Sequence, residues 1–125
     1  MKNFYCKIFV NSLMSVDQIA NKISDLLDFK LDKHSSIESD VFTIDFFNNK
    51  EFNENKAIEF PDGFIHFPHF LDIDIVDEER EREYKEVVRK IMLYLWSEGC
   101  QLVASSDFED ELPHNGGYKQ SINYD

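Results

Sequence analysis

The stretch Leu71–Val76, which reads LDIDIV, decides the fold more than any other part of the sequence. Its apolar residues alternate with aspartates, a period of two that is typical of a strand with one buried face and one face in water. Asp77, Glu78 and Glu79 follow directly, as in the first turn of a helix, where the helix dipole favours negative charge. A stripe of apolar residues at helical spacing then extends as far as Gly99. Its members are Tyr84, Val87, Val88, Ile91, Met92 and Leu95. The stretch therefore predicts a strand that leads straight into a long helix.

Another strand and helix precede this unit. Phe4–Val10 has the alternation of a strand whose two faces are both partly covered. Ser15 and Gln18, three residues apart, form the pattern of a capping box, which marks the start of a helix. The apolar stripe of this helix consists of Ile19, Ile23, Leu26 and Leu27. These signals predict a strand–helix unit that ends near Phe29.

Further strand signals lie in the rest of the chain. The period of two returns over residues 41–47, and a short apolar run follows Gln101. A turn signal at residues 62–63 introduces Phe64–Phe67, which we expect to begin a strand. Pro68 interrupts this strand and indicates a bulge or an edge position.

The order strand, helix, strand, strand, helix, strand predicts an α+β fold of the ferredoxin-like split βαβ type (βαββαβ). In this fold a four-stranded, mostly antiparallel sheet carries both helices on one face, and the first strand lies beside the last. The alternative is an α+β sandwich in which the strand near Phe64 is a separate edge strand. We expect a single domain over residues 1–125, with a polar tail at residues 114–125.

The charge of the chain excludes several classes of partner. The 125 residues include 25 Asp and Glu against 13 Lys and Arg, a net charge of −12. Phosphate repels such a chain, so we expect no nucleic-acid or membrane partner and favour a basic protein. No apolar run approaches the roughly 20 residues that cross a bilayer, and the N-terminus lacks the pattern of a signal peptide. Because Cys6 and Cys100 lie in apolar runs, as buried thiols do, we expect a reduced, cytoplasmic protein.

Signals for catalysis are weak. The sequence has no Gly-rich phosphate loop, no H-E-x-x-H, no G-x-S-x-G and no C-x-x-C. The run Asp107–Glu111 offers paired carboxylates for hydrolysis, but acidic runs in loops are usually solvated surface. His66 and His69 point to opposite faces of a regular strand, so a shared zinc ion needs a bulge at Pro68. We expect hydrogen-bonded imidazoles, no metal, no cofactor and no enzyme activity. Metal or small-molecule binding through these histidines is the alternative.

The sequence indicates protein binding more strongly than catalysis, because the acidic residues are concentrated in two places. The first is a secondary acidic surface formed by Asp74, Asp77, Glu78 and Glu79. The second is the C-terminal acidic segment, residues 107–111. We expect the partner to bind through Asp107, Phe108, Glu109, Asp110, Glu111 and Tyr118. Aromatic anchors within a charged rim are typical of tight protein interfaces. The alternative is that Phe108 and Leu112 simply pack this segment against the sheet. In the predicted fold the two places lie at opposite ends of the helix–strand unit and need not form one patch.

A resemblance bears on the same segment. Residues 104–113 read ASSDFEDELP, and Gly116-Gly117-Tyr118 follows them. The helix end Leu95–Gly99, LWSEG, precedes them. In these features the last third of the chain resembles small bacterial immunity proteins of polymorphic-toxin and contact-dependent inhibition systems. The resemblance implies a cytoplasmic inhibitor that binds a toxin domain one to one.

Three classes of function result. An immunity protein that occludes the active site of a basic, nuclease-like toxin accounts for the acidity and for the missing catalytic motifs. An adaptor that forms a homodimer through sheet faces or edges accounts for Tyr5, Phe9 and Phe47 on the second faces of their strands. A small-molecule or metal-binding domain would use His66 and His69. We favour the first class.

Overall fold

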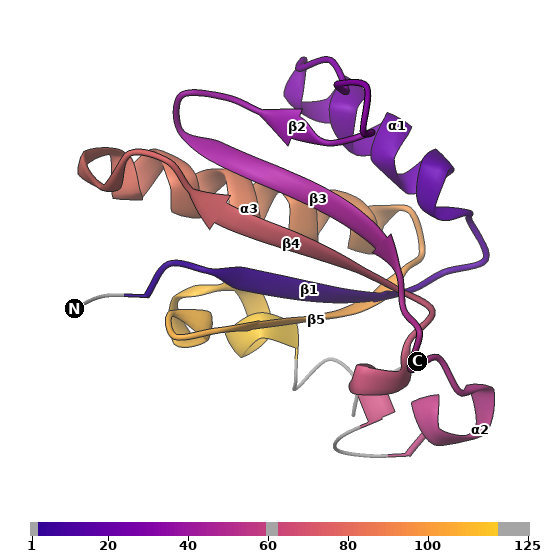
Figure 1. Ribbon diagram of the computed structural model, residues 1–125. Helices are drawn as coiled ribbons and strands as arrows, with labels where there is room; N and C mark the ends of the chain where they lie inside the picture. Colours follow the sequence, from indigo (N-terminus) through magenta and orange to yellow (C-terminus); the bar gives the residue numbers. More distant parts are fainter. Residues whose placement is uncertain (1–2, 60–62, 118–125) are drawn as a thin grey trace.

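The computed structural model describes residues 3–59 and 63–117 and contains one antiparallel sheet with its two long helices on one side (Figure 1). The strands are β1 (Cys6–Asn11), β2 (Ile37–Glu38), β3 (Phe42–Asn48), β4 (His69–Ile75) and β5 (Gln101–Ser106), in the order β2-β3-β4-β1-β5. The α-helices are α1 (Val16–Leu27), α2 (Glu54–Ala57) and α3 (Glu81–Ser97). The 3-10 turns are η1 (Gly63–His66), η2 (Glu78–Arg80), η3 (Glu109–Glu111) and η4 (Pro113–Gly117). No helix in the described part of the chain has the length and apolar character needed to cross a membrane.

The ends of the long helices follow local signals in the sequence. The Ser15 hydroxyl accepts the Gln18 N–H at 3.1 Å, and the Gln18 side chain accepts the Ser15 N–H at 2.9 Å. This confirms the predicted capping box of α1. The Asp77 carboxylate accepts the Glu79 N–H at 3.0 Å, so it caps the turn η2 that leads into α3. Gly99 follows α3 with a φ of +85°, a left-handed conformation that favours glycine.

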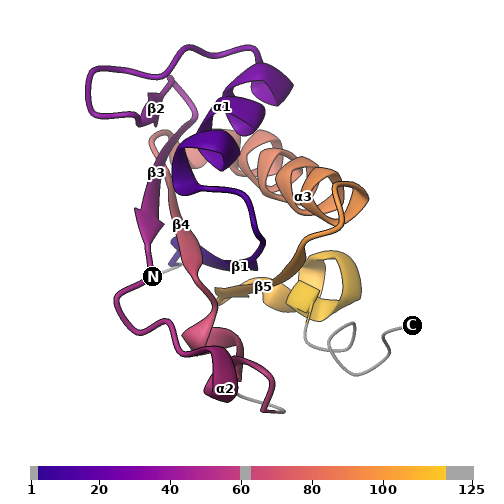
Figure 2. The ribbon, with the colours of Figure 1, turned by 90° about the vertical axis from the view of Figure 1, so that its right-hand side faces the viewer.

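Alternation along the strands gives the sheet one covered and one uncovered face. On β1, the side chains of Cys6, Ile8 and Val10 are buried in the core that the sheet forms with α1 and α3. Leu71 and Ile73 on β4 belong to the same core. Figure 2 shows both long helices on this side of the sheet, with α2 at one end of the molecule. The intervening residues of the strands therefore point to the side that neither long helix covers.

The predicted four-stranded ferredoxin-like fold with two helices is wrong. The sheet has a fifth strand, β2, which pairs with β3 through Ile37 opposite Ile44. This strand is two residues long, so its sequence contains no alternation that could have indicated it. A third α-helix, α2, interrupts the expected polar connection, and the Asn53 side chain caps it by accepting the Lys56 N–H at 3.0 Å. The fold is α+β, with a five-stranded antiparallel sheet.

The expected strand at Phe64–Phe67 is also wrong, and with it the alternative of a separate edge strand near Phe64. These residues form most of the turn η1. The Asn49 amide donates to the carbonyls of Ile65 and Phe67 at 3.0 and 2.7 Å, which ties them to the end of β3. Pro68 has no N–H for a strand ladder, and β4 begins only at the following residue.

The predicted polar tail at residues 114–125 starts too early. Residues 114–117 belong to η4, and Gly116 and Gly117 are buried. A Cβ atom on Gly117 would lie 2.5 Å from the carbonyl oxygen of Leu102, so this turn packs closely against β5. Residues 118–125 lie outside the described part of the chain.

Candidate partner-binding surfaces

The apolar residues of the C-terminal acidic segment and its continuation are buried. Phe108 and Leu112 each expose 5% of their surface and belong to the core. The ring of Phe108 meets that of Tyr84 edge-on, with centroids 6.1 Å apart. The prediction that Phe108 is an exposed anchor is therefore wrong. Its ring instead holds the segment against α3 and the sheet.

The carboxylates of this segment differ in their surroundings. Glu109 accepts the Ser106 N–H at 3.2 Å and closes the turn after β5. Glu111 forms an ion pair at 3.0 Å with Lys85 of α3. Asp107 and Asp110 are exposed to solvent. Of the predicted binding residues here, Asp107, Asp110 and Glu111 are exposed, and Glu111 is in addition paired with Lys85, while Tyr118 lies outside the described residues.

A hollow of about 450 Å³ separates this segment from α3, and its charge is mixed. Its charged lining consists of Glu81, Arg82, Lys85, Glu86, Arg89 and Glu111. Lys85 pairs with Glu81 at 2.6 Å as well as with Glu111, and so joins the start of α3 to the C-terminal acidic segment. Because cations alternate with carboxylates, this hollow is less selective for a basic partner than the charge of the segment alone suggested.

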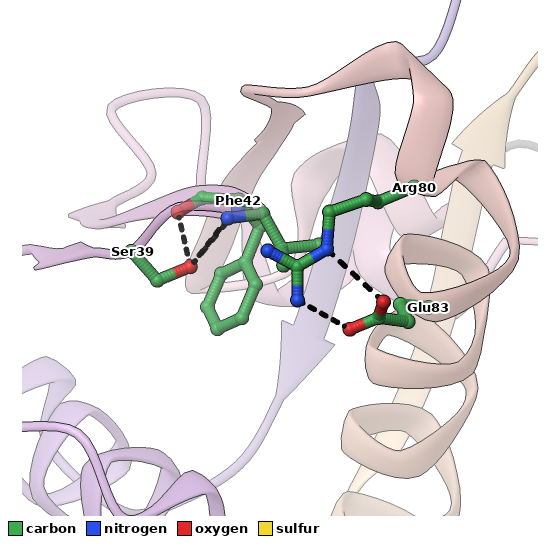
Figure 3. A network of polar contacts seen from close by, with 5 residues as sticks. Ser39, Phe42, Arg80 and Glu83 are labelled. Carbon is green, nitrogen blue, oxygen red and sulfur yellow. Dashed lines mark hydrogen bonds and ion pairs between the residues drawn. The ribbon is translucent and has the colours of Figure 1, made fainter.

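The secondary acidic surface divides between a sheet face and a helix start. Glu78 and Glu79 are exposed on η2, whereas Asp74 lies on the uncovered face of β4. Arg80 turns toward Glu83 and donates to both oxygens of its carboxylate at 3.0 and 2.8 Å (Figure 3). This pairing leaves the carboxylates of η2 pointing to solvent at the start of α3.

The turn into β3 is closed by a hydroxyl, as Figure 3 also shows. Ser39 Oγ accepts the Phe42 N–H at 3.0 Å and donates to the Phe42 carbonyl at 3.1 Å. The start of β3 is therefore held in place next to the secondary acidic surface.

The two histidines contact different backbone carbonyls. Nδ1 of His66 lies 2.9 Å from the Glu51 carbonyl oxygen, and Nε2 of His69 lies 2.8 Å from that of Met14. Burial lowers the pKa of His69. Within residues 3–59 and 63–117, no three His, Cys, Asp or Glu side chains are grouped so that they could hold a metal ion. Burial also raises the pKa of the Cys6 thiol to about 12, so this thiol is a core residue and not a nucleophile.

The uncovered face of the sheet carries an arrangement that sequence reasoning missed. Phe47, Phe70 and Phe9 lie side by side on β3, β4 and β1, and we call them the aromatic row. Phe47 stacks on Phe70 with centroids 5.0 Å apart, and Phe9 lies 6.3 Å from Phe70. Two residues along each strand, on the same face, Asp45 lies opposite Asp72, and Asp72 lies opposite Lys7.

The carboxylates on this face are held by hydroxyl and backbone donors. The Tyr5 hydroxyl donates to Asp72, and the Ser36 hydroxyl donates to Asp45. Burial and the hydrogen bond to Asp72 raise the pKa of Tyr5, which therefore remains a donor at neutral pH. Asp74, two residues further along β4, accepts the N–H of Ile75 at 2.9 Å. We call Asp45, Asp72 and Asp74 the sheet carboxylates.

Lys7 is the cation among these groups. Its ammonium lies 4.0 Å from the centroid of the Phe70 ring and 5.1 Å from that of Phe9. A cation over an aromatic face is attracted by the ring quadrupole. Lys7 is thus engaged by the aromatic row, although it lies opposite Asp72 in the register.

Alternation in the sequence had placed Tyr5, Phe9 and Phe47 on the second faces of their strands. It could not show which residues of different strands are neighbours, because that depends on the register.

Comparisons of the chain with protein-family models, with curated proteins and with solved structures give no match.

Proposed function

We propose that this chain is an acidic binding protein that captures a basic protein one to one, and that the partner is a nuclease-like bacterial toxin domain whose active site it occludes. The observation that carries the proposal is the rigid display of carboxylates. Asp74 and Asp107 are exposed, and the apolar residues next to them in the chain, Ile73 and Phe108, are buried in the core. Groups held in place before binding lose less entropy when a partner docks.

The net charge of −12 supports a cationic partner. Opposite charges accelerate encounter, and steered association reaches about 10⁸–10⁹ per molar per second at low salt. Carboxylates also offer a nuclease site the negative charge that it otherwise finds in phosphate. We place this activity in the cytoplasm, where the buried thiols of Cys6 and Cys100 remain reduced.

The test is co-purification with the product of the upstream neighbouring gene. We expect that product to be basic, to form a one-to-one complex with this chain in light scattering, and to lose its toxicity when both are expressed. The association rate should fall by roughly tenfold or more between about 20 and 200 mM salt, as expected for steering by charge. An upstream product that is not basic, or that elutes separately from this chain at micromolar concentration, contradicts the proposal.

A further inference from the structure

We infer that the basic partner docks on the uncovered face of the sheet, across β3, β4 and β1, and not on the C-terminal acidic segment. This inference rests on the proposed function and specifies its contact surface. The partner it fits is a protein that presents lysine or arginine side chains beside an apolar contact. The aromatic row would receive the apolar contact, and the sheet carboxylates would receive the cations.

The first reason is the accessibility of one ring of the aromatic row. Phe47 exposes 41% of its surface, whereas Phe9 exposes 8%, Phe70 is half-buried and Phe108 exposes 5%. Aromatic side chains near the centre of an interface contribute a large share of the binding energy. The uncovered face of the sheet thus presents exposed aromatic surface together with carboxylates, whereas the C-terminal acidic segment presents carboxylates with a buried ring.

The second reason is the shape of this face. Phe64 of η1 packs edge-on against Phe9, with centroids 5.3 Å apart, and so forms a wall at the end of the aromatic row. A hollow of about 380 Å³ lies beside this wall, and Tyr5, Lys7, Ile65 and Asp107 contribute to its lining. A partner side chain that entered the hollow would meet aromatic rings, the Lys7 ammonium and the Asp107 carboxylate. Asp107, predicted to bind the partner, therefore belongs to this face as well.

The third reason is charge. The donors to Asp45 and Asp72 are neutral hydroxyls, and among the described residues neither carboxylate forms an ion pair. Lys7 lies opposite Asp72, but its ammonium lies over the Phe70 ring. Glu111 of the C-terminal acidic segment, in contrast, is paired with Lys85. The three sheet carboxylates outnumber Lys7, so this face attracts a basic partner.

The same charge argues against a second copy of this chain as the occupant. Two copies packed face to face would bring Asp45, Asp72 and Asp74 close to the same residues of the other copy. Like charges brought together across an interface disfavour association. The aromatic row by itself would suit a homodimer, but the sheet carboxylates select a cationic surface.

The experiment compares two pairs of matched variants in binding to the upstream gene product. Asp74→Lys and Asp110→Lys make the same charge change at exposed aspartates. Asp74 lies on the uncovered face of the sheet, and Asp110 lies in the C-terminal acidic segment. Phe47→Ala and Phe29→Ala remove rings that are equally exposed, at 41%, and each ring contacts one other phenylalanine. Phe29 follows α1 and lies away from the uncovered face. Urea midpoints of all four variants show whether each one is folded.

We expect Asp74→Lys to slow association at low salt by about tenfold, and Phe47→Ala to raise Kd by about tenfold or more. Asp110→Lys and Phe29→Ala should each remain within about threefold of the unmodified chain. If Asp110→Lys weakens binding and Asp74→Lys does not, the docking surface is the C-terminal acidic segment and only this inference fails. If the unmodified chain does not bind, the proposed function itself fails. A dimer in sedimentation that Phe47→Ala dissociates would assign the face to a second copy and overturn the inference.

Discussion

The substitution Phe108→Ala distinguishes a core residue from a binding residue in the C-terminal acidic segment. Phe108 exposes 5% of its surface, its ring lies against that of Tyr84, and the Lys85 ammonium lies 5.3 Å from its centroid. Truncation to alanine leaves a cavity next to Tyr84. We therefore expect the main effect on the free energy of unfolding and not on affinity for a partner.

Replacing a buried phenylalanine by alanine costs about 3–5 kcal/mol. Phe108 lies in a turn at the margin of the core, where the chain can move partly into the space, so we take about 3 kcal/mol. With an m-value of about 1.5 kcal/mol per molar urea, the unfolding midpoint should fall by about 2 M. A domain with a stability of about 5–15 kcal/mol would still be folded in water.

Urea unfolding followed by tryptophan fluorescence and far-UV circular dichroism measures this midpoint. Phe47→Ala is the matched control, because it removes the same ring from a position that is 41% exposed and costs about 1 kcal/mol. Equal midpoints for Phe108→Ala and Phe47→Ala would refute the assignment of Phe108 to the core. So would an unchanged midpoint together with lost binding of the partner.

Three further predictions concern buried polar groups and backbone strain. Tyr84→Phe should lower the free energy of unfolding by about 1–3 kcal/mol, because the Tyr84 hydroxyl contacts two backbone carbonyl oxygens in the core, at 2.5 and 3.0 Å. Gly117→Ala should cost about 2 kcal/mol or more, since its φ is +94° and a Cβ atom would lie 2.5 Å from the Leu102 oxygen. Burial lowers the pKa of His69, so the unfolded chain takes up this proton first when the pH falls below about 6.5. The stability advantage of the unmodified chain over His69→Gln should therefore shrink between pH 7 and pH 5, as measured by urea unfolding at each pH.

Matched variants separate these effects from a nonspecific loss of stability. Gly99→Ala tests a positive φ without a clash, because no atom lies within 4 Å of its added Cβ, and it should cost about 1 kcal/mol. A Gly117→Ala cost no larger than this would show that the contact with β5 is loose. Parallel pH profiles for the unmodified chain and His69→Gln would rule out a role for His69. An unchanged midpoint for Tyr84→Phe would contradict its hydrogen bonds.

Features that depend on neighbours in the chain could be predicted from the sequence. The capping box of Ser15 and Gln18, the acidic cap at Asp77 and the left-handed Gly99 each involve residues a few positions apart. Their hydrogen bonds form whenever the local backbone turns, so the pattern alone is sufficient.

Features that depend on distant contacts were predicted poorly. Phe64–Phe67 has the composition of a strand, but the Asn49 amide holds it in a turn. The strand β2 forms because Ile37 pairs with Ile44 on β3. Its two residues are too few to show the alternation that indicates a strand. The alternative interpretation of Phe108 was correct, yet composition could not distinguish an aromatic anchor from a core ring, because both are apolar residues among acids.

By itself, the sequence determined the net charge of −12, the start of α1, the acidic turn that leads into α3 and the faces of single strands. Charge is a sum over residues, and caps and alternation act over a few positions, so none of these requires knowledge of the packing. The tertiary structure alone decided that Asp45, Asp72 and Lys7 share one line across three strands. It also decided that Glu111 meets a cation while the sheet carboxylates meet hydroxyls and a backbone N–H. These contacts join residues far apart in the chain, and only the packing of helices on the sheet brings them within reach of each other.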